Sequence, residues 1–249
     1  MEWEVFTPPP GWVVHYLHET GSTNDLAKEA GEEGAPERTV YVADHQTKGR
    51  GRMGRSWFEK PGNALLFSIL FRRNLSHSFL LTMLCSVAAA KAIDRIAGVR
   101  TEIKWPNDLM LGGKKLAGVL TETSWCWPES FAVVGVGINV NFDPSLVEGI
   151  PDTATSLRLE TGREISRPQL LHEILVQIDA FLAFDLEQLE DQVRLEWAAR
   201  LWRRRQKVVV VEGNLTLEGV FEDVAEDGAL LLRLDDGSLQ PLRVGDLQI

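Results

Sequence analysis

The chain of 249 residues is long enough for one domain, or for one domain with a small appendage. Hydrophobic residues make up 44% of it and charged residues 25%, a composition typical of soluble globular proteins rather than of disordered chains. Acidic residues outnumber lysines and arginines by 36 to 26, so the net charge of −10 argues against a protein whose main task is to grip nucleic acid by neutralising phosphates.

Apolar runs separated by turn residues predict the elements of the first part of the chain. Ser22 and Thr23 are residues that cap helices, so a helix is expected to start there, after a short apolar strand. In chain order the pattern further predicts strands at 13–17, 39–43 and 64–71, a helix at 78–97, a strand at 101–105, a hairpin of 108–111 with 115–123 that turns at Gly112-Gly113, and a strand at 131–140.

In the last third of the chain, the pattern of apolar and turn residues changes near Gln206. Residues 167–204 predict a helical pair with one apolar face and an acidic cluster. From residue 207 to 249, short apolar runs are broken by glycines and Asp-Gly pairs at a spacing typical of small all-β barrels. We therefore expect two domains, 1–205 and 206–249.

The sequence carries no visible export, membrane or metal-binding signal. Cys85 and Cys126 are too few for a disulfide framework and lack zinc-ligand spacing, so both are expected to pack as small hydrophobic residues. Residues 1–11 carry acids and prolines where a signal peptide needs basic and then apolar residues. The most apolar segment, 80–90, is far shorter than the ~20 residues that cross a bilayer. We expect a cytoplasmic protein without membrane attachment.

The glycine-rich stretch at 49–55 is the most unusual local feature. Residues 48 to 60 contain three arginines and two lysines but a single acid, Glu59, so a polyanion is the expected ligand. Glycines let backbone amides approach phosphate oxygens, and the absence of a Walker A motif excludes a P-loop NTPase. Trp57 and Phe58 offer faces for a purine, and Gln46 offers an amide for a neutral polar ligand. The alternative is a solvated loop whose charges only aid solubility.

Two further motifs lie downstream of this basic loop. Lys-Trp-Pro-Asn-Asp at 104–108 is followed by Lys-Leu-Ala-Gly at 115–118, and the predicted hairpin can bring Asp108 and Lys115 to one end of a sheet. A lysine there can oppose charge that develops on a phosphoryl or acyl centre, although a surface lysine is the simpler interpretation. Gly-x-Gly-Ile-Asn at 135–139 allows close backbone approach to a strand, or marks only a sheet bulge.

In this order and at these separations, the motifs resemble those of the biotin protein ligase family, also called biotin–acetyl-CoA-carboxylase ligases. The resemblance covers about residues 20–141 and rests on Ser22-Thr23-Asn24, Gln46, the Gly-Arg-Gly-Arg-x-Gly-Arg loop with Trp57, Lys-Trp-Pro-Asn-Asp, Lys-Leu-Ala-Gly and Gly-x-Gly-Ile-Asn. It implies an α+β fold, with a mixed-sheet catalytic domain of the biotin/lipoate ligase type and a small carboxyl-terminal SH3-like β-barrel.

The resemblance also implies a two-step reaction. The carboxylate of biotin attacks the α-phosphorus of ATP, with Mg²⁺, and gives biotinyl-5′-adenylate and pyrophosphate. A lysine of a biotin carboxyl carrier domain then attacks the mixed anhydride and expels AMP. A carboxylate and a triphosphate repel each other until cations such as Arg52 and Lys115 neutralise both, so the residues agree with this scheme.

The family's roles carry over to matching positions of this chain. The resemblance implies Lys115 and Arg52 as catalytic residues, with Asp108 as a weaker assignment for a base or orienting group. Biotin would contact Ser22, Thr23, Asn24, Gln46, Arg50, Gly51, Arg52, Lys115 and Gly118. ATP and the adenylate would contact Gly49, Arg52, Arg55, Trp57, Asn107, Lys115 and Asn139, and no metal ligands are assigned.

Some members of the family carry an amino-terminal DNA-binding domain. Only about twenty residues precede Ser22 here, so we expect a purely catalytic ligase that does not bind DNA. Two alternatives stay open: a lipoate or octanoate ligase or transferase of the same superfamily, and a nucleic-acid-binding regulator whose binding would depend steeply on salt. The sequence does not identify the acceptor carboxylase, and pairing of sheet edges into a homodimer is a further expectation from the family.

Overall fold

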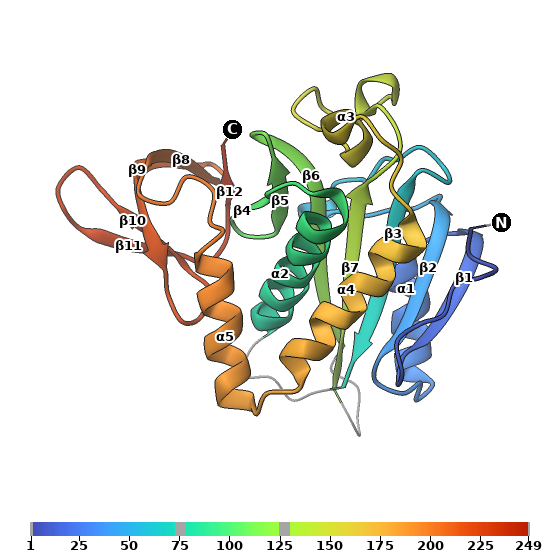
Figure 1. Cartoon of the computed structure of the whole chain (residues 1–249). Coiled ribbons are helices and arrows are strands. Elements are labelled where there is room, and N and C mark those ends of the chain that lie inside the picture. Colours follow the sequence, from blue (N-terminus) through green and yellow to red (C-terminus); the bar gives the residue numbers. More distant parts are fainter. Residues whose placement is uncertain (1, 73–77, 125–129, 249) are drawn as a thin grey trace.

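The computed structural model describes residues 2–72, 78–124 and 130–248. Its larger part is a seven-stranded sheet in the order β1-β2-β3-β7-β6-β5-β4 (Figure 1). Among the described strands of this sheet, β1 and β2 pair in parallel and all other neighbours pair antiparallel. The strands are β1 (Val13–Thr20), β2 (Thr39–Gln46), β3 (Ala64–Phe71), β4 (Glu102–Lys104), β5 (Asp108–Leu111), β6 (Lys114–Ser124) and β7 (Phe131–Asn139).

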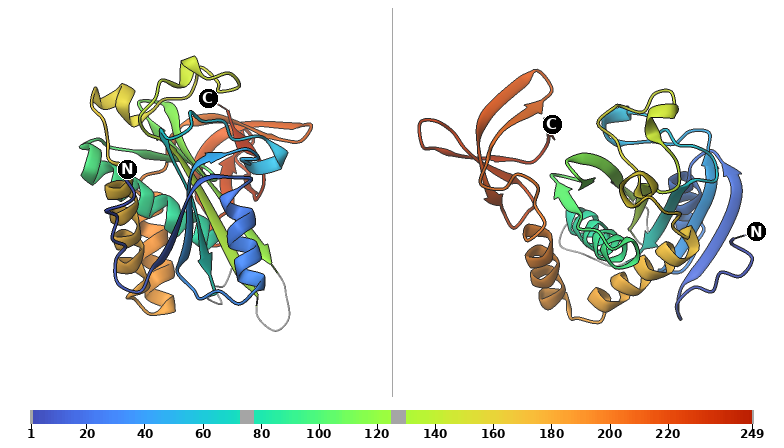
Figure 2. Two further views of the ribbon diagram at one scale, coloured as in Figure 1. Left: turned by 90° about the vertical axis from the view of Figure 1, so that its right-hand side faces the viewer. Right: turned by 45° about the horizontal axis from the view of Figure 1, so that its top comes forward.

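Helices cover both faces of this sheet. Helix α1 (Thr23–Glu32) lies on one face, and α2 (Ser78–Ala97) and α4 (Arg167–Leu182) lie on the other, as the left view of Figure 2 shows. Strand β3 needs this two-sided cover because all eight of its residues are buried. Leu65 and Phe67 join the main core with α2 and α4, while Leu66 and Leu70 belong to smaller clusters on the other face.

The chain after residue 206 forms a second, antiparallel sheet in the order β11-β10-β9-β8-β12. Helix α5 (Leu186–Ala198) leads into it, and the buried indole Nε1 of Trp105 donates to the carbonyl of Gly228 at 3.0 Å, which ties the two sheets together. In the described residues the outer strands β11 and β12 do not pair, so the predicted barrel is an open sheet. The strands are β8 (Lys207–Glu212), β9 (Leu215–Val224), β10 (Leu230–Arg233), β11 (Leu239–Leu242) and β12 (Asp246–Leu247).

The predicted α+β class with a mixed sheet is confirmed, and each predicted strand and helix of the first 140 residues is present. The predicted helical pair is α4 and α5, but α5 ends at Ala198 rather than near residue 204. The sequence pattern missed α3 (Leu157–Thr161) and the 3₁₀ turn Pro144–Leu146, because elements of a single turn show no periodicity.

Two smaller expectations concern the cysteines and the membrane. Cys85 is buried among apolar residues of α2, as predicted, and Cys126 lies outside the described residues. None of the helices that the structure describes is long and apolar enough to span a bilayer.

Candidate functional site

A cavity of about 520 Å³ opens beside the basic loop, at the ends of several strands of the large sheet. Its wall comes from the start of α1, the end of β2, the loop itself, strands β5 to β7, the segment 149–154 and β12. Of the residues predicted for the site, Gly49 does not line the cavity; its carbonyl accepts from Trp57 N at the base of the loop. The others do: Ser22, Thr23, Asn24, Gln46, Arg50, Gly51, Arg52, Arg55, Trp57, Asn107, Asp108, Lys115, Gly118 and Asn139.

One end of the cavity is built from neutral polar side chains. Gln46 Oε1 accepts from the backbone N–H of Thr23 at 2.7 Å and from its hydroxyl at 3.0 Å. The hydroxyl of Ser68 lies 2.7 Å from Thr23 Oγ1 and 2.5 Å from Asn24 Oδ1. Ser22 is the N-cap of α1, but its side chain makes no capping hydrogen bond. These groups thus hold one another in place, and among the described residues the Ser22 hydroxyl and the amide nitrogen of Gln46 remain for an uncharged polar ligand.

Arg50 of the loop is held beside this polar end by two carboxylates. Its guanidinium binds Asp25 in a bidentate pair, at 2.7 and 2.8 Å, and also reaches Glu122 Oε2 at 3.3 Å. The hydrogen bond to Asp25 raises the pKa of Arg50. Glu122 Oε2 also accepts from Asn24 Nδ2 at 2.5 Å. Arg50 lines the cavity, but its charge is already neutralised, so we expect it to anchor the loop.

Trp57 forms the floor of the cavity, against two strands that carry glycine where it lies. A Cβ on Gly137 would come 2.6 Å from the Trp57 ring, and a Cβ on Gly118 would come 3.1 Å from it. Gly135 leaves similar room for Asn24, since a Cβ there would lie 2.2 Å from Asn24 Oδ1. The Gly-x-Gly pattern thus lets the aromatic ring and the amide approach the sheet closely.

Cations gather at the other end of the cavity. Lys115 Nζ pairs with Asp108 Oδ1 at 2.8 Å and lies 5.7 Å from the centroid of the Trp57 ring. Arg52 reaches Asn107 Oδ1 at 3.2 Å, but its ion pair with Asp246 is long, at 3.5 Å. Burial lowers the pKa of Arg52. A mostly buried guanidinium with long contacts is poorly neutralised, so this end of the cavity suits an anion.

Two asparagines border the cationic end. Asn107 Nδ2 donates to the carbonyl of Val119 at 2.8 Å, which fixes the amide whose oxygen faces Arg52. Asn139 Nδ2 donates to the carbonyl of Thr155 at 2.9 Å, while its Oδ1 is buried and has no hydrogen-bond partner among the described residues. A buried acceptor without a partner costs free energy, so it is free to accept a donor from a ligand.

Sequence reasoning missed several residues of this wall. Lys104 lines the cavity, and burial lowers its pKa; it belongs to the Lys-Trp-Pro-Asn-Asp motif, which could have indicated it. Asp246 lines the cavity from the second sheet, and Glu122, seven residues beyond Lys115, does not line it but binds Arg50 of the wall. No local pattern marks either carboxylate, because only the tertiary fold brings them to the loop.

Comparisons with known proteins agree on one family. Residues 16–139 match the Biotin/lipoate A/B protein ligase family, and residues 206–248 match the Biotin protein ligase C terminal domain. The chain is similar to the bifunctional ligase/repressor BirA of Bacillus subtilis, with 34% identity over 220 residues, or 87% of this chain and 68% of that protein. It is also 32% identical over 226 residues to the biotin–[acetyl-CoA-carboxylase] ligase of Paracoccus denitrificans, covering 87% of this chain and 92% of that one.

Solved structures show the same likeness over nearly the whole chain. The biotin protein ligase from Aquifex aeolicus in complex with biotin and ATP superposes with a TM-score of 0.78 at 27% identity, over 95% of this chain and 97% of that one. A mutant of the same Aquifex protein in complex with biotin gives a TM-score of 0.80 at 28% identity, with the same coverage. The fold, the motifs and the relatives agree, and the chain therefore belongs to the biotin protein ligase family and is a ligase.

Proposed function

We propose that this ligase activates biotin with ATP as biotinyl-5′-adenylate and transfers it to one lysine of a biotin carboxyl carrier domain. The observation that supports this most directly is the division of the cavity. Neutral donors and acceptors at one end suit the uncharged ureido ring, and poorly neutralised cations at the other suit a carboxylate beside a phosphate. The structure of the Aquifex relative is a complex with biotin and ATP.

In the first half-reaction, the chain's own side chains would bring two anions together. Lys115 and Arg52 would neutralise the biotin carboxylate and the α-phosphate, and so stabilise the charge that builds up as the new bond forms. Asp108 is paired with Lys115 at 2.8 Å, so it would orient that ammonium group rather than act on its own. Trp57 would cover the purine, and Asn139 Oδ1 would accept from its amino group.

Magnesium would enter this site with the nucleotide. The residues that the structure describes contain no cluster of three or more His, Cys, Asp or Glu that could hold a metal ion alone. Asp108 and Asp246 are carboxylates in the cavity wall, and Mg²⁺ is commonly held by one or two carboxylates together with substrate phosphates. Both already pair with cations of the wall, Lys115 and Arg55, so the metal would be held mainly by the phosphates of the nucleotide, where it would supply charge neutralisation.

In the second half-reaction, the amine of the carrier lysine would attack the acyl carbon of the adenylate. The carbon–nitrogen bond forms as the bond to the phosphate oxygen breaks, AMP leaves, and the amine loses a proton.

We further propose residues 1–205 as the catalytic domain and 206–249 as a carboxyl-terminal domain. The homodimer, the lack of DNA binding and the cytoplasmic location stay predictions.

Mass spectrometry of a carrier domain tests this function. The domain is incubated with the ligase, ATP and either biotin, lipoate or octanoate. We expect one added biotin on one lysine, which requires ATP, and no addition from the other two acids. Addition of lipoate or octanoate in place of biotin would instead support the lipoate or octanoate ligase alternative, and no addition from any acid would contradict both.

A further inference from the structure

Strand β2 extends past the end of its antiparallel partner. The paired ladder of β2 with β3 runs from Val40 to Ala43, and the last residues of β2 are not paired with β3. The carbonyl of Asp44 accepts instead from Gly62 N at 2.9 Å. Gln46, two residues further, directs its backbone N–H to the carboxylate of Glu59, at 3.3 Å. A side chain therefore takes the place of a strand where the ladder stops.

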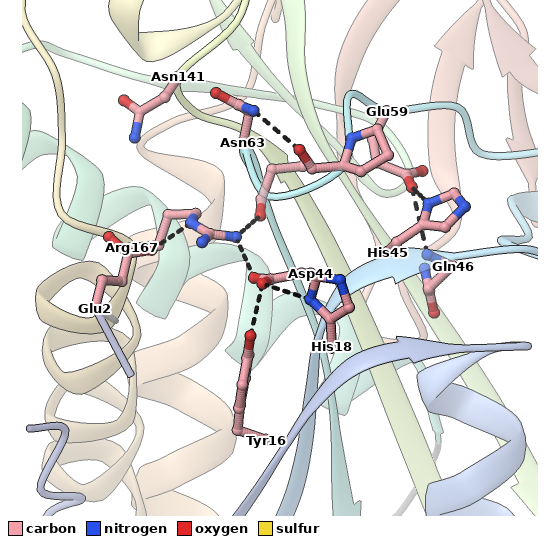
Figure 3. Close-up of polar contacts among 12 residues, drawn as sticks. Glu2, Tyr16, His18, Asp44, His45, Gln46, Glu59, Asn63, Asn141 and Arg167 are labelled. Atoms are coloured by element: carbon pink, nitrogen blue, oxygen red, sulfur yellow. Dashed lines mark hydrogen bonds and ion pairs between the residues drawn. The ribbon is translucent and has the colours of Figure 1, made fainter. Parts of the chain in front are cut away.

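Glu59 is well placed for this role because it is buried and one of its oxygens binds two residues of β2. Its side chain is 2% exposed, and the same oxygen, Oε1, lies 2.7 Å from His45 Nδ1 (Figure 3). It is the single acid between residues 48 and 60, on the segment that returns from the basic loop. A buried carboxylate is costly unless it is hydrogen-bonded, so these contacts fix the returning segment against the end of β2.

Glu59 binds the backbone of Gln46, and the side chain of Gln46 organises the polar end of the cavity. Gln46 Oε1 receives both the N–H and the hydroxyl of Thr23, so the position of Gln46 sets the start of α1. The neighbouring part of β2 is fixed independently, since the buried Arg167 binds Asp44 Oδ1 at 2.8 Å (Figure 3). Arg167 also binds the carbonyl of Ala64 at 3.1 Å. On its other edge Gln46 pairs with Thr20 of β1, and Glu59 supplies the contact on the edge that β3 leaves open.

We propose that Glu59 is a positioning residue, which acts through Gln46 on the neutral polar end of the cavity and so sets the affinity for the biotin ring but not the rate of the chemistry. The inference rests on the proposed function for its ligand. The contact between Glu59 and Gln46 exists in the free chain and does not depend on a bound ligand.

Steady-state pyrophosphate release in the presence of the carrier domain tests this proposal with Glu59→Ala and Glu59→Gln. We expect Glu59→Ala to raise KM for biotin roughly tenfold or more, because small misplacements of a binding group are amplified in affinity, and to leave KM for ATP and kcat within about twofold. Glu59→Gln keeps an oxygen that can accept from Gln46 N–H, so it should restore most of the biotin affinity. If Glu59→Ala fails to fold, Glu59→Leu fills the same space without an acceptor.

Glu32→Ala is the matched control, because Glu32 is an exposed acid at the far end of α1. Equal rises in both KM values, a fall in kcat alone, or a Glu59→Gln variant as impaired as Glu59→Ala would overturn the proposal. Hydrogen exchange of the Gln46 backbone amide in the free chain tests the positioning role separately from the proposed function. Protection in the wild type that is lost in Glu59→Ala supports the contact between Glu59 and Gln46. An unprotected amide in the wild type overturns it. If the wild type shows protection but releases no pyrophosphate with biotin, the proposed function fails on its own.

Discussion

Lys115 has the environment expected of a charge that acts on a ligand. Its ammonium is held by Asp108 at 2.8 Å and stays 35% exposed to the cavity, so it is oriented without being enclosed. We expect Lys115→Ala to reduce biotin-dependent pyrophosphate release by two orders of magnitude or more, because a preorganised cation contributes roughly 3 kcal/mol to such a transition state. Biotin binding should remain measurable by calorimetry. Release near the wild-type rate would remove Lys115 from the catalytic residues.

A second prediction at this scale concerns Asn139 Oδ1, which has no hydrogen-bond partner in the part of the chain that the structure describes. Adenine presents an amino group where guanine presents a carbonyl, so a buried acceptor should favour ATP over GTP. We expect Asn139→Ala to raise KM for ATP about tenfold and to narrow the preference for ATP over GTP, measured by pyrophosphate release with each nucleotide. An unchanged preference in the variant would show that this oxygen does not face the base.

At the scale of elements, the basic loop combines a tightly paired arginine with a weakly paired one. Arg50 is neutralised by Asp25 and Glu122, whereas within the described residues Arg52 pairs with one carboxylate, that of Asp246, at 3.5 Å. Arg52→Gly should therefore leave the loop attached but weaken its hold on the single negative charge of the adenylate. We expect the variant to release activated biotin that labels bystander lysines, detected as streptavidin-reactive serum albumin. Arg50 or Arg55 becomes the better candidate if Arg52→Gly makes adenylate but labels albumin no more than the wild type does.

The elements also show how far the sequence could be interpreted. Strand β3 was predictable because eight consecutive apolar or small residues can be buried on both faces, and the hairpin was predictable from Gly112-Gly113, both of which have positive φ. The loop was recognised from its charge, but its shape was not: Met53 adopts a positive φ of 56° in a short 3₁₀ turn, a conformation that no sequence rule assigns to methionine.

On the scale of the whole molecule, the second sheet takes part in the cavity wall. Trp105, within the Lys-Trp-Pro-Asn-Asp motif, is 1% exposed and donates to Gly228 of the second sheet, so the motif is held from that side. Arg52 and Arg55 both reach Asp246 of β12, and Arg52 also reaches the carbonyl of Gly245 just before this strand. The sequence showed a change of texture near Gln206 but no sign of this contact, since nearly 200 residues separate its partners.

Asp246 is the counter-charge that this second sheet supplies to the loop. Arg55 pairs with Asp246 Oδ2 at 2.7 Å and Arg52 lies 3.5 Å from its other oxygen, so one carboxylate restrains both arginines beside the cavity. Without it, two like charges would repel each other, and the loop would lose its contact with β12. We therefore expect Asp246→Asn to raise KM for ATP several-fold and to increase albumin labelling, with little change in thermal stability, because exposed ion pairs contribute only about 1 kcal/mol or less.

Asp235→Asn is the control for this prediction, because it removes the same charge from an exposed turn of the same sheet. Salt gives an independent check: in the wild type, raising the ionic strength should weaken the contact between loop and sheet and increase adenylate leakage, since partly exposed pairs are screened. Asp246→Asn has no such pair to lose, so its leakage should respond less to salt. A variant whose KM for ATP and salt response equal those of Asp235→Asn would show that the second sheet does not act on the loop through this carboxylate.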